Sequence, residues 1–197
     1  MQETKSRRRG AELEQAILAA AWAELSDVGY NKFTIEAVAA RAGTSKPVIY
    51  RRWAGRAELV LAAWANQVPK THDTPDTGAL RTDLLVLFTR IARRADTMVS
   101  EVIAGVMGEA FRHPEVAGLL RRRLDSSLIP DIVAKIVRRA VDRGEHPPVD
   151  LPPRAGRLPL DLIRNEAMTC GSPTTDETIV ELVDDVYLPL LRGLTRG

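Results

Sequence analysis

Several side chains that can bind a polyanion lie close together between Phe33 and Trp53. Lys46, Tyr50 and the pair Arg51–Arg52 offer ammonium, phenol and guanidinium donors within a few residues of one another. Such groups hydrogen-bond to phosphate oxygens and base edges, which is the chemistry of nucleic-acid recognition. A basic helix with a solvated face is the alternative interpretation. The elements that position these side chains decide between the two.

Two short helices separated by a tight turn are predicted for this stretch. The first covers residues 35–42, with Thr34 as its N-cap, because a threonine hydroxyl can accept from a free N–H of the first turn. Gly43 supplies the left-handed residue that ends this helix. Thr44 or Ser45 then caps the second helix. This arrangement is typical of a helix-turn-helix, in which the second helix enters the DNA major groove.

The same periodicity separates core positions from exposed ones. Ile49 and Trp53 are four residues apart, so we expect both to pack on the preceding helix. A longer helix over about residues 11–27 carries an apolar stripe, and a fourth helix begins after Gly55. Together the first three helices make the smallest unit in which such a hairpin can bury its apolar faces.

With these elements in place, the chain resembles the TetR/AcrR (tetracycline-repressor-like) family of bacterial transcriptional regulators. The resemblance covers about residues 9–64. It is carried by the segments AILAAAWAEL, GYNKFTIEAVAARAG, TSKPVIYRRW and GRAELV. It implies an N-terminal DNA-binding domain followed by a larger helical domain that binds an effector and dimerises.

The resemblance also implies which residues contact double-stranded DNA. These are Thr34, Thr44, Ser45, Lys46, Pro47, Val48, Tyr50, Arg51, Arg52 and Arg56. The family more often has an aromatic residue and histidine where this chain has Arg51 and Arg52, so the operator sequence is not predicted. Glu36 is left out of the set, because its carboxylate suits a helix N-terminus but repels phosphate.

Bulk composition agrees with a DNA-binding head. Residues 1–60 hold ten Lys/Arg and seven Asp/Glu, a balance of +3, whereas the rest hold eighteen and nineteen, a balance of −1. The one cysteine, Cys170, excludes an intrachain disulfide. The start of the chain is polar and no long apolar run occurs, so we expect a cytoplasmic protein without a membrane segment. The three histidines are scattered, and neither a metal nor a cofactor is expected.

The expected fold is all-α, with about nine helices, because no strand pattern occurs. A flexible basic arm over residues 1–10, which includes Arg7 to Arg9, precedes a helix-turn-helix domain over 11–55 and an effector-binding and dimerisation domain over 56–197. The expected later elements are helices over about 79–95, 97–112, 114–143 with an interruption at Pro130, 158–170 and 175–195, and a proline-rich loop over 144–159.

An effector cavity in the second domain is implied by the family resemblance. The predicted wall residues are Trp64, Phe88, Met98, Val102, Met107 and Phe111. For any single one of them, an ordinary core position is the favoured interpretation. Methionine adapts to irregular shapes, so the pair of methionines favours a hydrophobic or amphipathic small molecule.

The C-terminal helix carries a long apolar stripe with two interpretations, the core of one chain or the seam of a homodimer. The stripe residues assigned to the dimer interface are Ile179, Leu182, Val183, Val186, Tyr187 and Leu190. A two-fold operator needs two reading helices held about 34–36 Å apart, which favours the homodimer.

The sequence therefore predicts a ligand-responsive DNA-binding regulator that represses from a palindromic operator and is released by a small-molecule effector. The alternative is a helical ligand-binding or protein-interaction module without operator binding. An enzyme is not expected, because the chain shows no nucleophile–base pair, glycine-rich phosphate loop or metal cluster.

Overall fold

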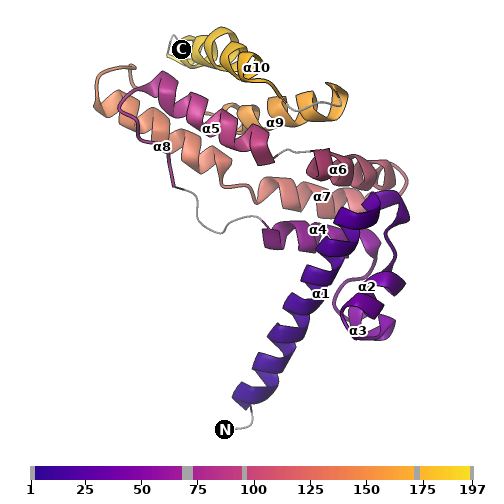
Figure 1. The fold of residues 1–197 in the computed structure, drawn as a ribbon. Coiled ribbons are helices and arrows are strands. Elements are labelled where there is room, and N and C mark those ends of the chain that lie inside the picture. Colours follow the sequence, from indigo (N-terminus) through magenta and orange to yellow (C-terminus); the bar gives the residue numbers. More distant parts are fainter. Residues whose placement is uncertain (1–2, 68–72, 95–96, 171–173, 196–197) are drawn as a thin grey trace. The chain divides into compact units, whose positions relative to one another are not determined.

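The computed structural model describes residues 3–67, 73–94, 97–170 and 174–195, and every regular element in these ranges is a helix, which confirms the all-α prediction. The elements (Figure 1) are α1 (Glu3–Lys32), α2 (Ile35–Arg41), α3 (Lys46–Tyr50), α4 (Arg56–Gln67), α5 (Leu80–Arg94), α6 (Thr97–Ala110), α7 (Pro114–Asp125), α8 (Ile129–Asp142), α9 (Pro153–Cys170), α10 (Asp176–Glu181), η1 (Leu182–Tyr187) and α11 (Leu188–Leu194). None of the helices in the described ranges has the length and apolarity to cross a membrane.

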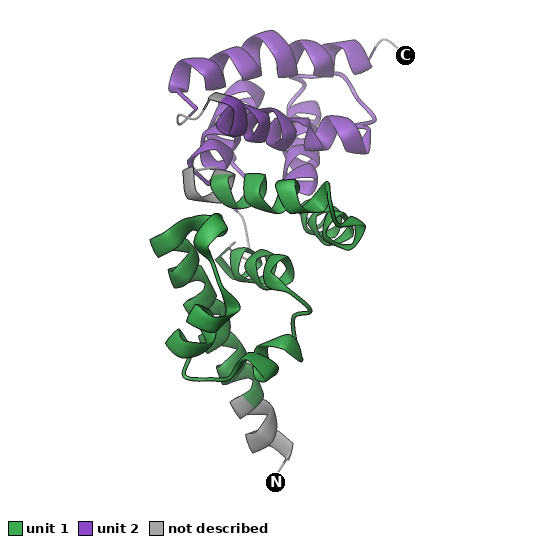
Figure 2. Cartoon of the chain, turned by 90° about the vertical axis from the view of Figure 1, so that its right-hand side faces the viewer, with its two compact units in different colours: residues 1–69, 101–126 green, residues 70–100, 127–197 purple. Residues whose placement is uncertain are grey.

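Two compact units divide the chain, and neither is continuous in sequence (Figure 2). The first unit contains residues 1–69 and 101–126, and the second contains residues 70–100 and 127–197. The packing therefore does not divide at the boundary expected between residues 55 and 56. Helices α4 and α7 and most of α6 belong with the first three helices.

A shared core explains this division. Ile17 of α1, Val38 of α2, Ile49 of α3, Leu59 of α4 and Val106 of α6 all have 0% of their surface exposed and belong to one apolar cluster. The helix-turn-helix is thus one side of a larger helical unit. Within this unit, α1 packs against both α2 and α4, and α2 packs against α3.

Helix α1 is longer than expected at both ends. It begins at Glu3, inside the segment predicted to be a flexible arm, and the side chains of Arg7 to Arg9 lie outside the described residues. At the other end, Gly29 adopts a left-handed φ of 70° and interrupts the helix two residues after the expected end at residue 27. One further turn then carries the chain to Lys32.

Pro130 and Pro159 both lie in helices, and Pro159 is the one that stands in a helix interior. The helix predicted over 114–143 is two helices, and Pro130 lies in the first turn of α8. The loop predicted over 144–159 is shorter than expected, because α9 already begins at Pro153 and contains Pro159. Pro159 has no N–H for the carbonyl of Ala155 one turn earlier. The buried Tyr187 hydroxyl donates to that carbonyl at 2.9 Å and so replaces the missing bond.

The C-terminal helix contains a π-helical segment that changes which residues are buried. Ile179, Val183, Tyr187 and Leu191 lie four residues apart and all belong to the core of the second unit. In a uniform α-helix, three such steps drift by about 120° around the axis. The wider π-helical turns of η1 offset this drift. Tyr187 also packs edge-on against Phe88, with ring centroids 5.6 Å apart.

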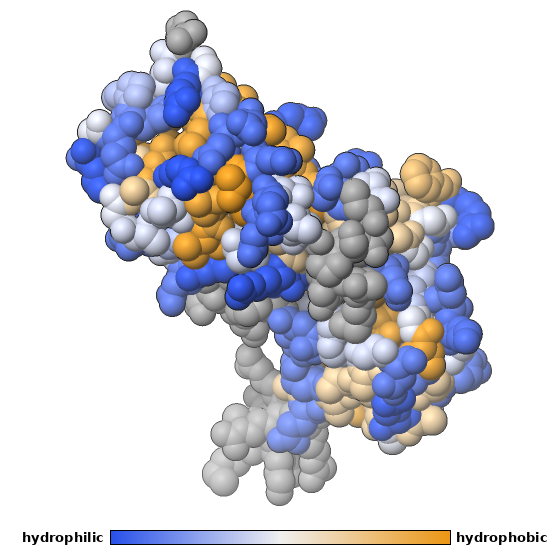
Figure 3. Space-filling view, turned by 45° about the horizontal axis from the view of Figure 1, so that its top comes forward, coloured by the Kyte–Doolittle hydropathy of each residue, from blue (hydrophilic) through white to orange (hydrophobic). Residues whose placement is uncertain are grey.

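Half of the predicted dimer stripe was therefore wrongly assigned. Ile179, Val183 and Tyr187 are core residues of a single chain, because the π-helical turns direct them inward. Leu182 and Leu190 are half-buried and Val186 is 41% exposed. Apolar side chains also reach the surface of the second unit in Figure 3, among hydrophilic ones.

Candidate nucleic-acid interface

The hairpin predicted from the sequence is present, with the cap of its first helix in the expected place. Thr34 accepts a hydrogen bond from the N–H of Ala37 at 3.2 Å and caps α2. Gly43 has a φ of 62°, the left-handed conformation that ends this helix. Helix α3 begins after Ser45, whose side chain makes no capping bond. The turn is thus set by the glycine and the threonine.

Two buried side chains orient the second helix of the hairpin. Ile49 is fully buried and Trp53 nearly so, and both belong to the core of the first unit, as predicted. Because these two anchor one face, the other faces of α3 point outward. Most of the predicted DNA contacts are exposed, and Thr44 and Val48 are half-buried. The exposed members are Thr34, Ser45, Lys46, Pro47, Tyr50, Arg51 and Arg52.

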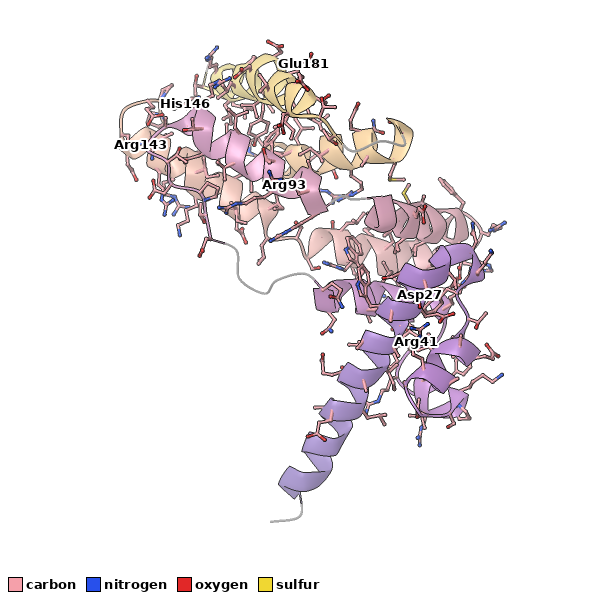
Figure 4. The ribbon with its side chains drawn as sticks, viewed as in Figure 1. Asp27, Arg41, Arg93, Arg143, His146 and Glu181 are labelled. Carbon is pink, nitrogen blue, oxygen red and sulfur yellow. The ribbon has the colours of Figure 1, made fainter. Side chains whose placement is uncertain are left out.

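Ion pairs hold the hairpin to its surroundings. Arg41 of α2 lies 3.0 Å from Glu24 and 2.7 Å from Asp27, both on α1, and Figure 4 shows Arg41 and Asp27 on facing helices. Hydrogen bonding to Asp27 raises the pKa of Arg41. Arg52 lies 2.8 Å from Glu14 and also donates to the carbonyl of Gly10 at 3.3 Å. The C-terminal end of α2 and the segment that follows α3 are therefore both tied to α1.

A further ion pair lies within the exposed set itself. The Lys46 ammonium at the start of α3 lies 2.5 Å from a carboxylate oxygen of Glu36 in the first turn of α2. This contact lowers the pKa of Glu36 and raises that of Lys46, so both groups are charged at neutral pH. Spacing along the chain does not reveal such a contact, because ten residues and a turn separate the partners.

Arg56 is not among the exposed contacts. Its guanidinium lies 2.9 Å from Glu109 of α6 and 4.5 Å from the ring centroid of Tyr30, and the Tyr30 hydroxyl donates to the same Glu109 oxygen at 2.6 Å. These three side chains connect the end of α1, the start of α4 and α6. A phosphate contact by Arg56 requires the guanidinium to leave this arrangement.

The Glu109 arrangement gives stability a defined pH dependence. Burial raises the pKa of Glu109, but hydrogen bonds from Tyr30 and Arg56 outweigh it, and the pKa is lowered. A lowered carboxyl pKa stabilises the fold above the unfolded value of about 4.3, and this stabilisation is lost as the pH falls through the folded value. We expect Glu109→Gln to cost about 1 kcal/mol at pH 7 in urea unfolding, after allowance for partial exposure. The difference from wild type should disappear below the folded pKa.

The control for this experiment is Asp150→Asn, which removes an exposed carboxylate from the loop before α9. Its unfolding curve should follow wild type at every pH. A Glu109→Gln deficit that persists unchanged into strong acid would contradict the assigned role of Glu109.

Gly105 is required for Tyr30 to reach Glu109. A Cβ atom at position 105 would lie 2.3 Å from Cδ1 of Tyr30. At this distance the ring of Tyr30 could not keep its position. We expect Gly105→Ala to destabilise the protein by about 1–3 kcal/mol, as overpacked cores do. Gly108→Ala on the same helix is the matched control. No atom lies within 4 Å of that added methyl group, so it should be neutral or stabilising. Thermal unfolding of both variants checks the pair, and equal melting temperatures would contradict the prediction.

The predicted effector-wall residues do not form one group. Val102 is buried in the core of the first unit, and Trp64 and Met107 pack against that core. Phe88 lies in the core of the second unit. Phe111 was wrongly predicted, because it follows the last turn of α6 and is 87% exposed. The side chain of Met98 lies outside the described residues.

Trp64 has a neighbour that sequence reasoning did not pair with it. The Arg123 guanidinium of α7 lies 4.5 Å from the centroid of the indole ring and donates to Ser126 at 3.2 Å. Burial lowers the pKa of Arg123. One face of the indole is therefore covered by a cation.

The sequence of this chain is similar to those of known transcriptional regulators. Residues 17–63 match the model of bacterial regulatory proteins of the tetR family, and residues 74–186 match the tetracyclin repressor-like C-terminal domain. An uncharacterised HTH-type transcriptional regulator of Mycobacterium tuberculosis is 35% identical over 92% of this chain and 89% of its own length. A DNA-binding transcriptional repressor TetR of Mycobacteroides abscessus is also 35% identical, over 93% of this chain and 96% of its own.

Solved structures show the same fold. A TetR transcription regulator from Haloarcula marismortui superposes with a TM-score of 0.67 over 92% of this chain and 98% of its own, at 17% identity. At that identity the likeness concerns the fold alone.

Proposed function

This chain belongs to the TetR family of bacterial transcriptional regulators, and on that premise we propose that it is a ligand-responsive repressor that binds a palindromic operator as a homodimer. Members of this family bind DNA and are not enzymes. The observation that carries the proposal is the outward-facing set on α3, with Lys46, Tyr50 and Arg51 exposed while Ile49 and Trp53 are buried. Repression is supported by the name of the Mycobacteroides abscessus relative.

Homodimer formation is supported by the apolar residues that remain on the surface of the C-terminal helix. Leu182, Val186 and Leu190 are spaced by four residues beside the buried stripe and are half-buried or exposed. Two copies of this surface, packed together with α9, would form a four-helix bundle with two-fold symmetry. Such symmetry presents the two reading helices to the two halves of a palindrome.

The proposed effector is a hydrophobic small molecule that binds beside α4 and α6. Trp64, Val102 and Met107 remain together in the first unit, and all three are apolar. An effector at this place would contact α4, which packs against α1, and α1 in turn packs against α2 of the hairpin. It would shift the protein from a DNA-binding to a non-binding conformer only by its difference in affinity for the two, which is typically about 1–3 kcal/mol.

The test is binding of the purified protein to the DNA that flanks its own gene, with a footprint and a measurement of stoichiometry. We expect a footprint with two-fold symmetry, two chains per site, and competition by random DNA only at large excess. The same probe then serves to screen hydrophobic compounds for release. Equal, weak binding to every DNA of the same length would overturn the proposal in favour of a helical module that no longer reads DNA.

A further inference from the structure

Phosphate binding does not explain the ion pair between Glu36 and Lys46, which lies on the exposed surface of α2 and α3. Both side chains are about half exposed, at 61% and 49%, so the pair lies at the surface of the hairpin. It joins the first turn of α2 to the first residue of α3. A carboxylate at this place is unfavourable beside the negatively charged DNA backbone.

In the free protein Lys46 already has an anionic partner. To neutralise a phosphate, its ammonium must leave Glu36, and the carboxylate is then left without a cation near the DNA backbone. A complex made of phosphate contacts alone therefore gains little from Lys46 and is weakened by Glu36. Non-specific binding to DNA of arbitrary sequence rests on such phosphate contacts.

A G·C base pair satisfies both groups best, because guanine offers the ammonium two adjacent acceptors, whereas an A·T pair offers single acceptors on either side of its amino group. In the major groove, a G·C pair presents the O6 and N7 acceptors of guanine beside the N4 amino donor of cytosine. Lysine donates to the former, and a glutamate accepts from the latter. An ammonium and a carboxylate held 2.5 Å apart match this neighbouring acceptor and donor.

We propose that Glu36 and Lys46 act as one reading unit that selects a G·C base pair in each half of the operator and lowers affinity for DNA without it. The inference rests on the proposed function as an operator-binding regulator and names the sequence feature that this surface would recognise. Glu36 is then a specificity-determining residue.

The experiment measures wild type, Glu36→Gln and Glu36→Asp on the operator, on operators with each G·C pair changed singly to A·T, and on random DNA. Asp150→Asn is the control, since it removes one negative charge from an exposed loop of the second unit. Unfolding curves establish that all four proteins fold alike.

We expect Glu36→Gln to bind random DNA about five-fold more tightly, because one like charge near the phosphates is removed. At one symmetric position, the change to A·T should weaken wild type by about ten-fold and weaken Glu36→Gln far less. Glu36→Asp keeps the charge on a shorter side chain. It should therefore bind random DNA as wild type does but lose the preference at that position.

The outcomes separate the inference from the function beneath it. If wild type selects an operator and Glu36→Gln keeps the same base-pair profile, or if it binds random DNA no better than Asp150→Asn does, the inference is overturned and the function stands. If wild type selects no sequence at all, both are overturned.

Discussion

A single glutamate in place of Val186 is expected to separate the dimer and to lower operator affinity by at least about 100-fold. Val186 is 41% exposed at the centre of the stripe formed with Leu182 and Leu190. A carboxylate there would face its own copy across a two-fold axis, where two like charges would be buried without partners. The operator has two half-sites, and a monomer has only one recognition helix to bind them. Half of the contacts and their fixed spacing are therefore lost.

Sedimentation velocity and operator titration measure the two effects of Val186→Glu. The control is Val28→Glu, which introduces the same charge at a valine of similar exposure in the first unit. Val28→Glu should remain dimeric. A Val186→Glu protein that sediments as a dimer would place the interface on another surface.

Replacing Arg51 by alanine is expected to weaken operator binding by about 10–100-fold while leaving the fold intact. Arg51 is the C-cap of α3, and its side chain is exposed. An arginine on a recognition helix that forms two hydrogen bonds with guanine contributes about 1–3 kcal/mol of base discrimination. The loss should therefore be larger on the operator than on random DNA.

Two further variants make the role of Arg51 specific. Arg51→Lys keeps the charge but not the planar pair of donors, so it should recover affinity for random DNA and only part of the affinity for the operator. Arg138→Ala removes an exposed charge from the second unit and should bind like wild type. Equal losses on operator and random DNA for Arg51→Ala would reduce Arg51 to a phosphate contact.

The hairpin was predictable because its signals are local. Thr34 caps the helix that follows it, Gly43 is the residue type that tolerates a positive φ, and the spacing of Ile49 and Trp53 identifies the buried face. Each of these depends on neighbours within one or two turns. Family resemblance then added the exposed residues, which periodicity alone leaves without a role.

The remaining features depend on contacts between distant residues. Arg56 and Glu109 are separated by 53 positions, and no periodicity indicates that they meet. The C-terminal stripe was assigned on the assumption of regular α-helical geometry, and the π-helical segment at 182–187 changed which of its members are buried. Phe111 has the composition of a pocket residue, but it follows the last turn of α6 and is exposed.

The carboxylates beside the basic residues of the first unit also affect how strongly operator binding depends on salt concentration. Arg52 and Arg56 are each paired with a glutamate in the free protein. A cation that exchanges an internal carboxylate for a phosphate leaves a new anion behind, which recruits a cation from solution. Fewer counterions are then released overall than the number of basic side chains suggests. The logarithm of the operator-binding constant should therefore fall with the logarithm of salt concentration less steeply than about 0.9 per phosphate-contacting cation.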